Sequence, residues 1–197
     1  MKIKFNLYYL FLIQILLIFI TSCSLYKQGM ELKTFSNCNF SLQKVNVISV
    51  AGVNVAEANK LGDLSMNDYL MLAKRAFGKE LPSQLKITIK TYNPGTKRAY
   101  VNGMDWELYL KGELYSRGTI NTPVEVLPKH KTTFDVISTF NLFEIIHSKS
   151  LPQLLHVIFQ KDKSINLSDL DAFLKVKPWY NSGSTVKKFP TFIKIKL

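Results

Sequence analysis

The stretch "IKTYNPGTKRAYVNGMDWELYLKGELYSRG", residues 89–118, decides the fold class. Apolar and polar residues alternate up to its Asn-Pro-Gly turn, and they alternate again from Met104 onward. Such alternation is typical of half-buried β-strands. Asn93-Pro94-Gly95 stops the first strand, because proline cannot donate to a ladder and glycine accepts a positive φ. The stretch therefore predicts two strands of a β-sandwich around a turn.

The second of these strands, Met104 to Tyr115, is predicted to have an apolar and a polar face. The apolar face is expected to carry Met104, Trp106, Leu108, Leu110 and Leu114, and the outer face Asp105, Glu107, Tyr109, Lys111, Glu113 and Tyr115. Three acids against one lysine suit a face turned to solvent, whereas binding to phosphates needs a concentrated positive surface. The basic residues of the stretch are therefore predicted not to read nucleic acid.

Further strands and a helix are predicted on both sides of this stretch. Residues 40–55 read as a strand with a bulge near Gln43-Lys44. A helix is expected to start at the N-cap Ser65 and to end at Gly78. Its apolar stripe, which is expected to pack on the domain, consists of Met66, Tyr69, Leu70, Ala73, Ala76 and Phe77.

The C-terminal half continues the β pattern. Residues 119–127 read as a strand broken by Pro123, residues 132–140 as a strand, and residues 142–159 as helical in period. The segments "DAFLKVKPWY" and "FPTFIKIKL" end the chain as two strands. Short strands between Pro/Gly turns predict a mainly β fold, an immunoglobulin- or fibronectin-III-like sandwich with one or two added helices over residues 37–197.

The N-terminus "MKIKFNLYYLFLIQILLIFITSC" has the build of a secretory leader. Lys2 and Lys4 precede a nearly unbroken apolar run, and small polar residues follow it. A retained membrane-spanning helix is the rival interpretation, but Ile20-Thr21-Ser22-Cys23 resembles the lipobox of bacterial lipoproteins. That resemblance implies a signal peptide at residues 1–22, acylation of Cys23, and a lipidated tether, expected to be irregular, at residues 23–36.

The residues after Cys23 refine the predicted location. Ser24 is not the aspartate that holds lipoproteins at the inner membrane in enteric bacteria, and no acidic cluster of the kind used for surface export follows it. The resemblance therefore implies a protein of the outer membrane that faces the periplasm. Its expected partner is the membrane itself, through the lipid on Cys23.

The charge and the second cysteine limit the possible functions. The net charge of +12 is spread along the chain without a block of five or six like charges. Outside the cytoplasm, the anionic partner at hand is a membrane surface. The best candidates for that contact are Lys187, Lys188, Lys194 and Lys196 in the terminal segment. Cys38 has no partner once Cys23 is acylated, and it is expected to be a buried small residue.

The order of elements resembles the WHy or late-embryogenesis-abundant (LEA) type 2 domain. The matching features are Asn93-Pro94 after a strand, a following strand pair that ends in glycine, Gly103–Gly118, and the Pro-led strand Pro128–Phe140. The resemblance covers roughly residues 38–140, and "VKPWYNSGSTVKKFPTFIKIKL" would supply the closing strands. It implies a fibronectin- or immunoglobulin-like sandwich, an association with stress, lipid or membrane contact in some members, and no catalytic residues. Asn93 and Pro94 are expected to shape the turn.

The sequence carries no motif that predicts an enzyme, a metal site or a cofactor. The three histidines lack the i, i+4 spacing of a metal pair, and neither a glycine-rich phosphate loop nor a Gly-x-Ser-x-Gly elbow is present. Asp169 and Asp171 near Ser168 read as a helix cap or turn. A hydrolase assembled from distant residues is the least favoured function.

The predicted function is that of a non-enzymatic envelope lipoprotein with a binding, stress-related or organising role. In one version its sheets part to bind lipid or another apolar ligand; the ligand-binding residues are not predicted. In the alternative it is a protein-interaction module, with a strand edge or the helical segment after Phe140 as the contact. A slot between the sheets would favour the first version. A closed core with an exposed apolar patch would favour the second.

Overall fold

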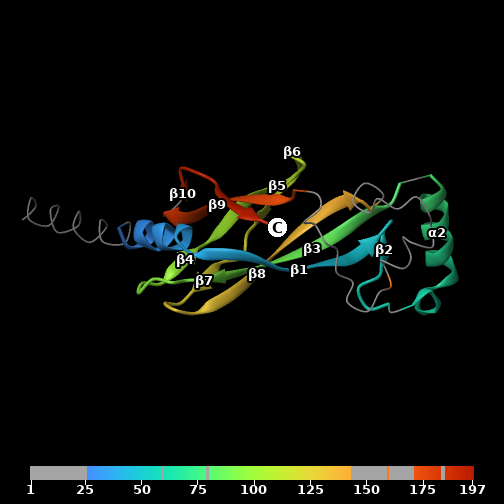
Figure 1. The fold of residues 1–197 in the computed structure, drawn as a ribbon, viewed down its shortest axis with the longest axis horizontal. Coiled ribbons are helices and arrows are strands. Elements are labelled where there is room, and N and C mark those ends of the chain that lie inside the picture. The colour runs from blue at the N-terminus through green and yellow to red at the C-terminus, as the bar shows by residue number, and fades with distance from the viewer. Residues whose placement is uncertain (1–25, 59, 79, 143–158, 160–170, 183–184) are drawn as a thin grey trace, which may run out of the picture.

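The computed structural model describes residues 26–58, 60–78, 80–142, 159, 171–182 and 185–197. This part of the chain is mainly β, as predicted, and the strand pairs formed within it are antiparallel (Figure 1). The strands are β1 (Asn39–Val50), β2 (Val53–Asn54), β3 (Pro82–Tyr92), β4 (Ala99–Val101), β5 (Gly103–Leu110), β6 (Glu113–Ile120), β7 (Val124–Val126), β8 (Lys131–Asn141), β9 (Phe173–Ser182), β10 (Thr185–Lys188) and β11 (Ile193–Lys196).

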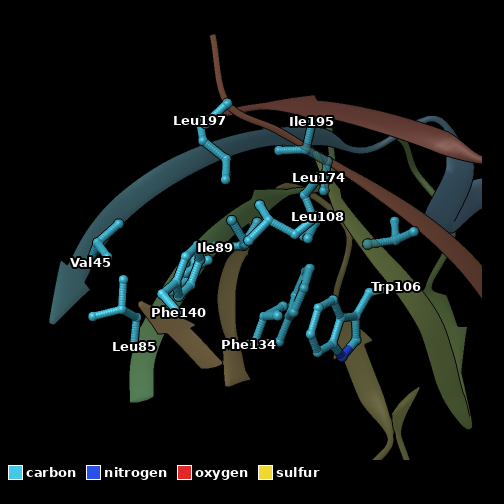
Figure 2. Close-up of a cluster of buried hydrophobic side chains, with 14 of the residues drawn as sticks. Val45, Leu85, Ile89, Trp106, Leu108, Phe134, Phe140, Leu174, Ile195 and Leu197 are labelled. Atoms are coloured by element: carbon cyan, nitrogen blue, oxygen red, sulfur yellow. The ribbon is translucent and has the colours of Figure 1, made fainter. Parts of the chain in front are cut away.

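The strands form two larger sheets and one small one. The first sheet has the order β2-β1-β3-β8; the second has the order β10-β9-β5-β6, with β11 also paired to β9; β4 and β7 form a separate pair. The apolar side chains of both larger sheets meet in one core (Figure 2). Val45, Leu85 and Ile89 reach this core from the first sheet, and Leu108 and Leu174 reach it from the second.

The predicted alternation is confirmed in β3 and β8, two neighbouring strands of the first sheet. Leu85, Ile87 and Ile89 of β3 are fully buried, because every second side chain of a strand points to the same face. Phe134, Val136 and Phe140 of β8 are buried in the same way. The predicted bulge is also confirmed, since the register of β1 against β3 shifts between Leu42 and Lys44.

The prediction of a single strand over residues 104–115 is wrong. β5 and β6 form a hairpin whose turn is Lys111-Gly112, with φ angles of 51° and 84°. Two successive positive φ angles are the geometry of a type I′ turn, which matches the twist of a two-residue hairpin. The turn reverses the faces: Leu114 is 48% exposed instead of buried, and Tyr115 stacks on the buried Phe140.

Helix α2 (Met66–Phe77) has the predicted ends but not the predicted packing face. The Ser65 side chain accepts a hydrogen bond from the Asp68 N–H, and Gly78 is the C-cap. The buried side chains are Leu72 and Ala76, whereas most of the predicted stripe is exposed. A short 3₁₀ turn, η1 (Leu61–Asp63), precedes the helix.

The prediction of an irregular tether up to Ser36 is wrong for its described part. Residues 26–36 are helical, and this N-terminal helix packs on the domain. Leu32 and Phe35 are buried, and the Phe35 ring packs edge-on against Phe40 at 5.4 Å between centroids. The i, i+3 spacing of these two residues was the sequence signal for the helix.

The described part of the molecule is elongated, and the N-terminal helix and α2 lie at opposite ends of it (Figure 1). The N-terminal helix lies at the end that carries β4 and β7, and α2 lies at the far end of the first sheet. The predicted signal peptide, Cys23 and nearly all of the helical segment predicted at 142–159 lie outside the described residues.

Candidate functional surfaces

Cys38 has the environment of a packing residue. Its side chain is 7% exposed, and its Sγ lies 3.5 Å from the carbonyl oxygen of Thr34. Burial raises the pKa of the Cys38 thiol to about 11. A nucleophilic cysteine needs the opposite shift, toward a stable thiolate. Cys38 is therefore a buried small residue, as the sequence predicted.

The remaining residues considered for chemistry are scattered. His130 lies exposed in the turn between β7 and β8, and Asp171 lies in a turn with a φ of 44°. His147, His156 and Asp169 lie outside the described residues. Within the ranges that the structure describes, no three His, Cys, Asp or Glu side chains group closely enough to hold a metal ion.

The helices that the structure describes are short or polar. None that the structure describes combines the length and the apolar character needed to cross a bilayer.

Asn93 joins two loops at the end of the molecule that carries the N-terminal helix. It is buried, and its Nδ2 donates to the carbonyl oxygens of Lys97 (2.8 Å) and Val126 (3.0 Å). Its Oδ1 accepts from the Gly95 N–H at 2.9 Å. The side-chain amide of Asn93 thus uses both its donor nitrogen and its acceptor oxygen, and these hydrogen bonds fix the turn after β3 against β7. This is the turn-shaping role that the sequence predicted.

Replacing Asn93 with aspartate is expected to destabilise the domain by about 2–3 kcal/mol. A carboxylate would face two carbonyl oxygens that now receive hydrogen bonds. The deficit should shrink in acid, because a protonated carboxyl group regains one donor and its neutral form is favoured by burial. Urea unfolding of the wild type and the variant at neutral and acidic pH measures this loss of stability. The exposed Asn121→Asp is the control and should stay within about 0.5 kcal/mol of wild type.

Two glycines make room for the two tryptophans of the second sheet. Gly103 lies opposite Trp179, and Gly118 lies opposite Trp106. A Cβ added at Gly103 would lie 2.5 Å from Trp179 Cζ2, and one at Gly118 would lie 2.6 Å from Trp106 Cζ2. Indole rings therefore cover both backbones, a packing reason for these glycines that the sequence alone did not provide.

The core between the sheets is closed in the described part of the chain. Inward side chains such as Ile87, Leu108 and Val136 are fully buried. Described residues line hollows of about 310–600 Å³ on the outer face of the second sheet, beside the N-terminal helix and at loops, and the buried Trp106 borders one of them. An apolar slot lined by these core residues is therefore not seen.

Helix α2 presents an apolar surface that the described part of the chain leaves uncovered. At 100° per residue, the apolar residues of α2 other than the exposed Met71 span about 160° of its circumference. One side of this arc holds the buried Leu72 and Ala76. The other side is formed by Met66, Leu70 and Phe77, which are 72%, 56% and 84% exposed. We call these three residues, with the neighbouring Tyr69, the α2 apolar face.

Lysines and aromatic rings alternate on the outer face of the second sheet. The ring of Tyr109 stacks on that of Phe173 at 4.8 Å, and Lys175 lies 4.2 Å from the Tyr109 centroid. Lys194 lies 3.9 Å from the Phe173 centroid, and Lys188 forms an ion pair with Asp105. Two of the four terminal lysines proposed for lipid contact thus already have intramolecular partners.

Comparisons with known proteins leave the family open. No family model matches the chain, and no curated protein matches it. Among solved structures, the chain is similar to the Northeast Structural Genomics Consortium target SoR45, with 9% identity, a TM-score of 0.37, and coverage of 83% of this chain and 89% of that one. It is also similar to a protein from Archaeoglobus fulgidus, with 15% identity, a TM-score of 0.31, and coverage of 80% and 98%. At these TM-scores neither similarity assigns a fold family.

Proposed function

We propose that this protein is a non-enzymatic interaction module of the bacterial cell envelope. A lipid on Cys23 anchors it to the periplasmic face of the outer membrane, and α2 docks a protein partner. Its domain is an immunoglobulin- or fibronectin-like sandwich of the LEA type 2 kind with added helices. The leader sequence supports the anchor, and the antiparallel sheets and the Asn93 turn support the domain type.

The α2 apolar face is the observation that carries this proposal. Its three most exposed apolar side chains follow the i, i+4, i+11 spacing of one helical stripe. Stripes of this kind serve as anchors when a helix docks into an apolar groove of another protein. The helix lies at the end of the molecule opposite the N-terminal helix, so an anchored domain would present this face away from its own membrane (Figure 1).

A protein partner fits the charges of α2 better than a lipid surface does. Helices that lie on membranes carry many lysines and arginines on their polar face. Helix α2 has Lys74 and Arg75 against Asp68, and Arg75 also lies 3.5 Å from Glu80. This weak positive charge gives little attraction to anionic lipid.

Binding of an apolar ligand between the sheets is the weaker candidate. It requires the sheets to part along a slot with apolar walls. The side chains that would form those walls, including Leu85, Ile87 and Leu174, are fully buried against one another. A ligand there would have to displace packed core residues.

Photo-crosslinking in cells tests the docking face. Benzoylphenylalanine at Met66 is expected to capture an envelope protein, and Leu70→Ser together with Phe77→Ser should reduce that adduct at least about tenfold, the effect of losing 1.4 kcal/mol of binding. The double variant should keep nearly wild-type stability, because both side chains are exposed. The same probe at the exposed Lys44 in β1 is the control and should give no such adduct.

Two results would contradict this function. An adduct formed only with a second copy of the chain would mean self-association in place of a distinct partner. A lipid mass retained in native mass spectrometry of the purified protein would favour binding of an apolar ligand.

The substitution of the buried Leu72 by alanine serves as a packing reference on the same helix. It should destabilise the domain by about 2–5 kcal/mol.

A further inference from the structure

We infer that the end of the domain beside the N-terminal helix is a contact surface for anionic lipid. This surface, the basic pole, consists of residues 26–36, 93–98 and 127–131. The inference rests on the proposed lipid anchor, because that anchor would bring this end of the molecule next to the membrane. It replaces the terminal lysines of β10 and β11 as the lipid contact.

The basic pole is strongly cationic. Its three segments hold six lysines and arginines and a single carboxylate, Glu31. Glu31 is buried and engaged by Arg98, whose Nη2 lies 2.7 Å from Glu31 Oε1. The exposed charges that remain are Lys27, Lys33, Lys97, Lys129 and Lys131.

Direct contacts hold the three segments together, although they lie far apart in the sequence. The Asn93 carbonyl accepts from the Lys129 N–H at 2.9 Å, and Lys129 Nζ donates to the Pro94 carbonyl. The hydrogen bonds between Arg98 and Glu31 connect the second segment to the N-terminal helix. The lysines are therefore displayed on a fixed frame, which reduces the entropy lost when they meet a surface.

The basic pole also offers apolar groups that suit a membrane interface. Tyr26 is 72% exposed, and Leu127 at the tip of the turn before β8 is 49% exposed. A hollow of about 600 Å³ opens between the N-terminal helix and the loop after β3, lined by residues that include Tyr26, Met30 and Lys97. An exposed tyrosine beside lysines is a combination found at the headgroup level of bilayers.

The orientation of the molecule favours this end over the others. Cys23 precedes Tyr26 by only three positions in the sequence, so a lipid on Cys23 would hold this pole next to the membrane. Lysines near an anionic surface each contribute about fivefold to binding, and this attraction falls off within about 10 Å. Lysines at the anchored end would lie within that range, whereas Lys74 belongs to α2 at the opposite end (Figure 1).

Site-directed fluorescence on the acylated full-length protein in vesicles tests the inference. Cys38 is buried with a raised pKa and should resist labelling, so a cysteine introduced at the exposed Thr96 can carry the dye. In vesicles with phosphatidylglycerol and a headgroup quencher, the dye at residue 96 should be quenched, and a dye at Asn67 on α2 should not. Vesicles of zwitterionic lipid alone should abolish the difference.

Charge variants identify the residues responsible. K97Q/K129Q/K131Q should weaken the contact by about a hundredfold, roughly fivefold for each lysine. K44Q/K60Q/K74Q removes the same charge elsewhere and should leave the quenching unchanged. Lys129 also donates a hydrogen bond to the Pro94 carbonyl oxygen, so its substitution could change the turn as well as the charge. K97Q/K131Q is therefore a second variant that leaves this hydrogen bond intact.

The possible outcomes separate this inference from the proposed function. Quenching at Thr96 that survives in the pole variant but disappears in K187Q/K194Q/K196Q would overturn the inference in favour of the terminal strands. Quenching at Asn67 instead of Thr96 would reverse the orientation and overturn it as well. Without an acyl mass on Cys23 both the anchor and the inference fail, whereas loss of the α2 adduct alone leaves the inference standing.

Discussion

Trp106→Ala is expected to lower the free energy of unfolding by about 3–5 kcal/mol. The Trp106 side chain is 5% exposed and belongs to the core between the two larger sheets (Figure 2). Its ring also covers Gly118 on the neighbouring strand, so truncation would leave a cavity lined by backbone as well as side chains. Urea unfolding followed by circular dichroism measures the loss, provided that the slope with urea stays unchanged.

The neighbouring Tyr109→Ala is the matched control for this substitution. Tyr109 lies on the opposite face of β5, is half-buried, and stacks on Phe173. Removal of that aromatic contact should cost about 1 kcal/mol. Equal losses in the two variants would mean that the face assignment of β5 has no energetic meaning.

Cys23→Ala is expected to abolish acylation completely and to leave the precursor uncut. The thiol is the only group at that position that can accept the lipid. The sequence Ile20-Thr21-Ser22-Cys23 resembles the lipobox of bacterial lipoproteins, in which cleavage depends on the modified cysteine. Metabolic labelling with a fatty acid and the gel mobility of the product measure both effects.

Cys38→Ala provides the internal control for the labelling. It removes the other cysteine of the chain, which is buried and should not carry lipid, so incorporation should stay at the wild-type level. Label that persists after Cys23→Ala would refute the anchor and, with it, the orientation proposed for the domain.

The sequence predicted those structural features that are determined by residues close together in the chain. Alternation identified β3 and β8, and the cap Ser65 and the terminator Gly78 placed the ends of α2. A local signal that was missed is Lys111-Gly112, because lysine is an unusual first residue for a turn with two positive φ angles. Missing it inverted the predicted faces of Leu114 and Tyr115.

The candidate surfaces could not be predicted from local sequence patterns, because they depend on the tertiary arrangement. The basic pole joins segments about 30 and 60 residues apart, which requires knowledge of the strand order. The direction in which α2 packs was also undetermined, since its apolar arc is wider than the side that contacts the domain. Hydrophobic period located the helix, but only the tertiary arrangement shows which half of the arc stays exposed.

The Trp–Gly pairs determine what an optical experiment on this protein can detect. The chain has two tryptophans, and both lie in the second sheet, Trp106 on β5 and Trp179 on β9. Tryptophan emission therefore reports on the local environment of that sheet, whereas far-ultraviolet circular dichroism averages over both sheets. Coincident transitions by the two probes would indicate that the sheets unfold as one cooperative unit. An emission change that precedes or follows the dichroism change would show that the β2-β1-β3-β8 sheet can persist or melt independently.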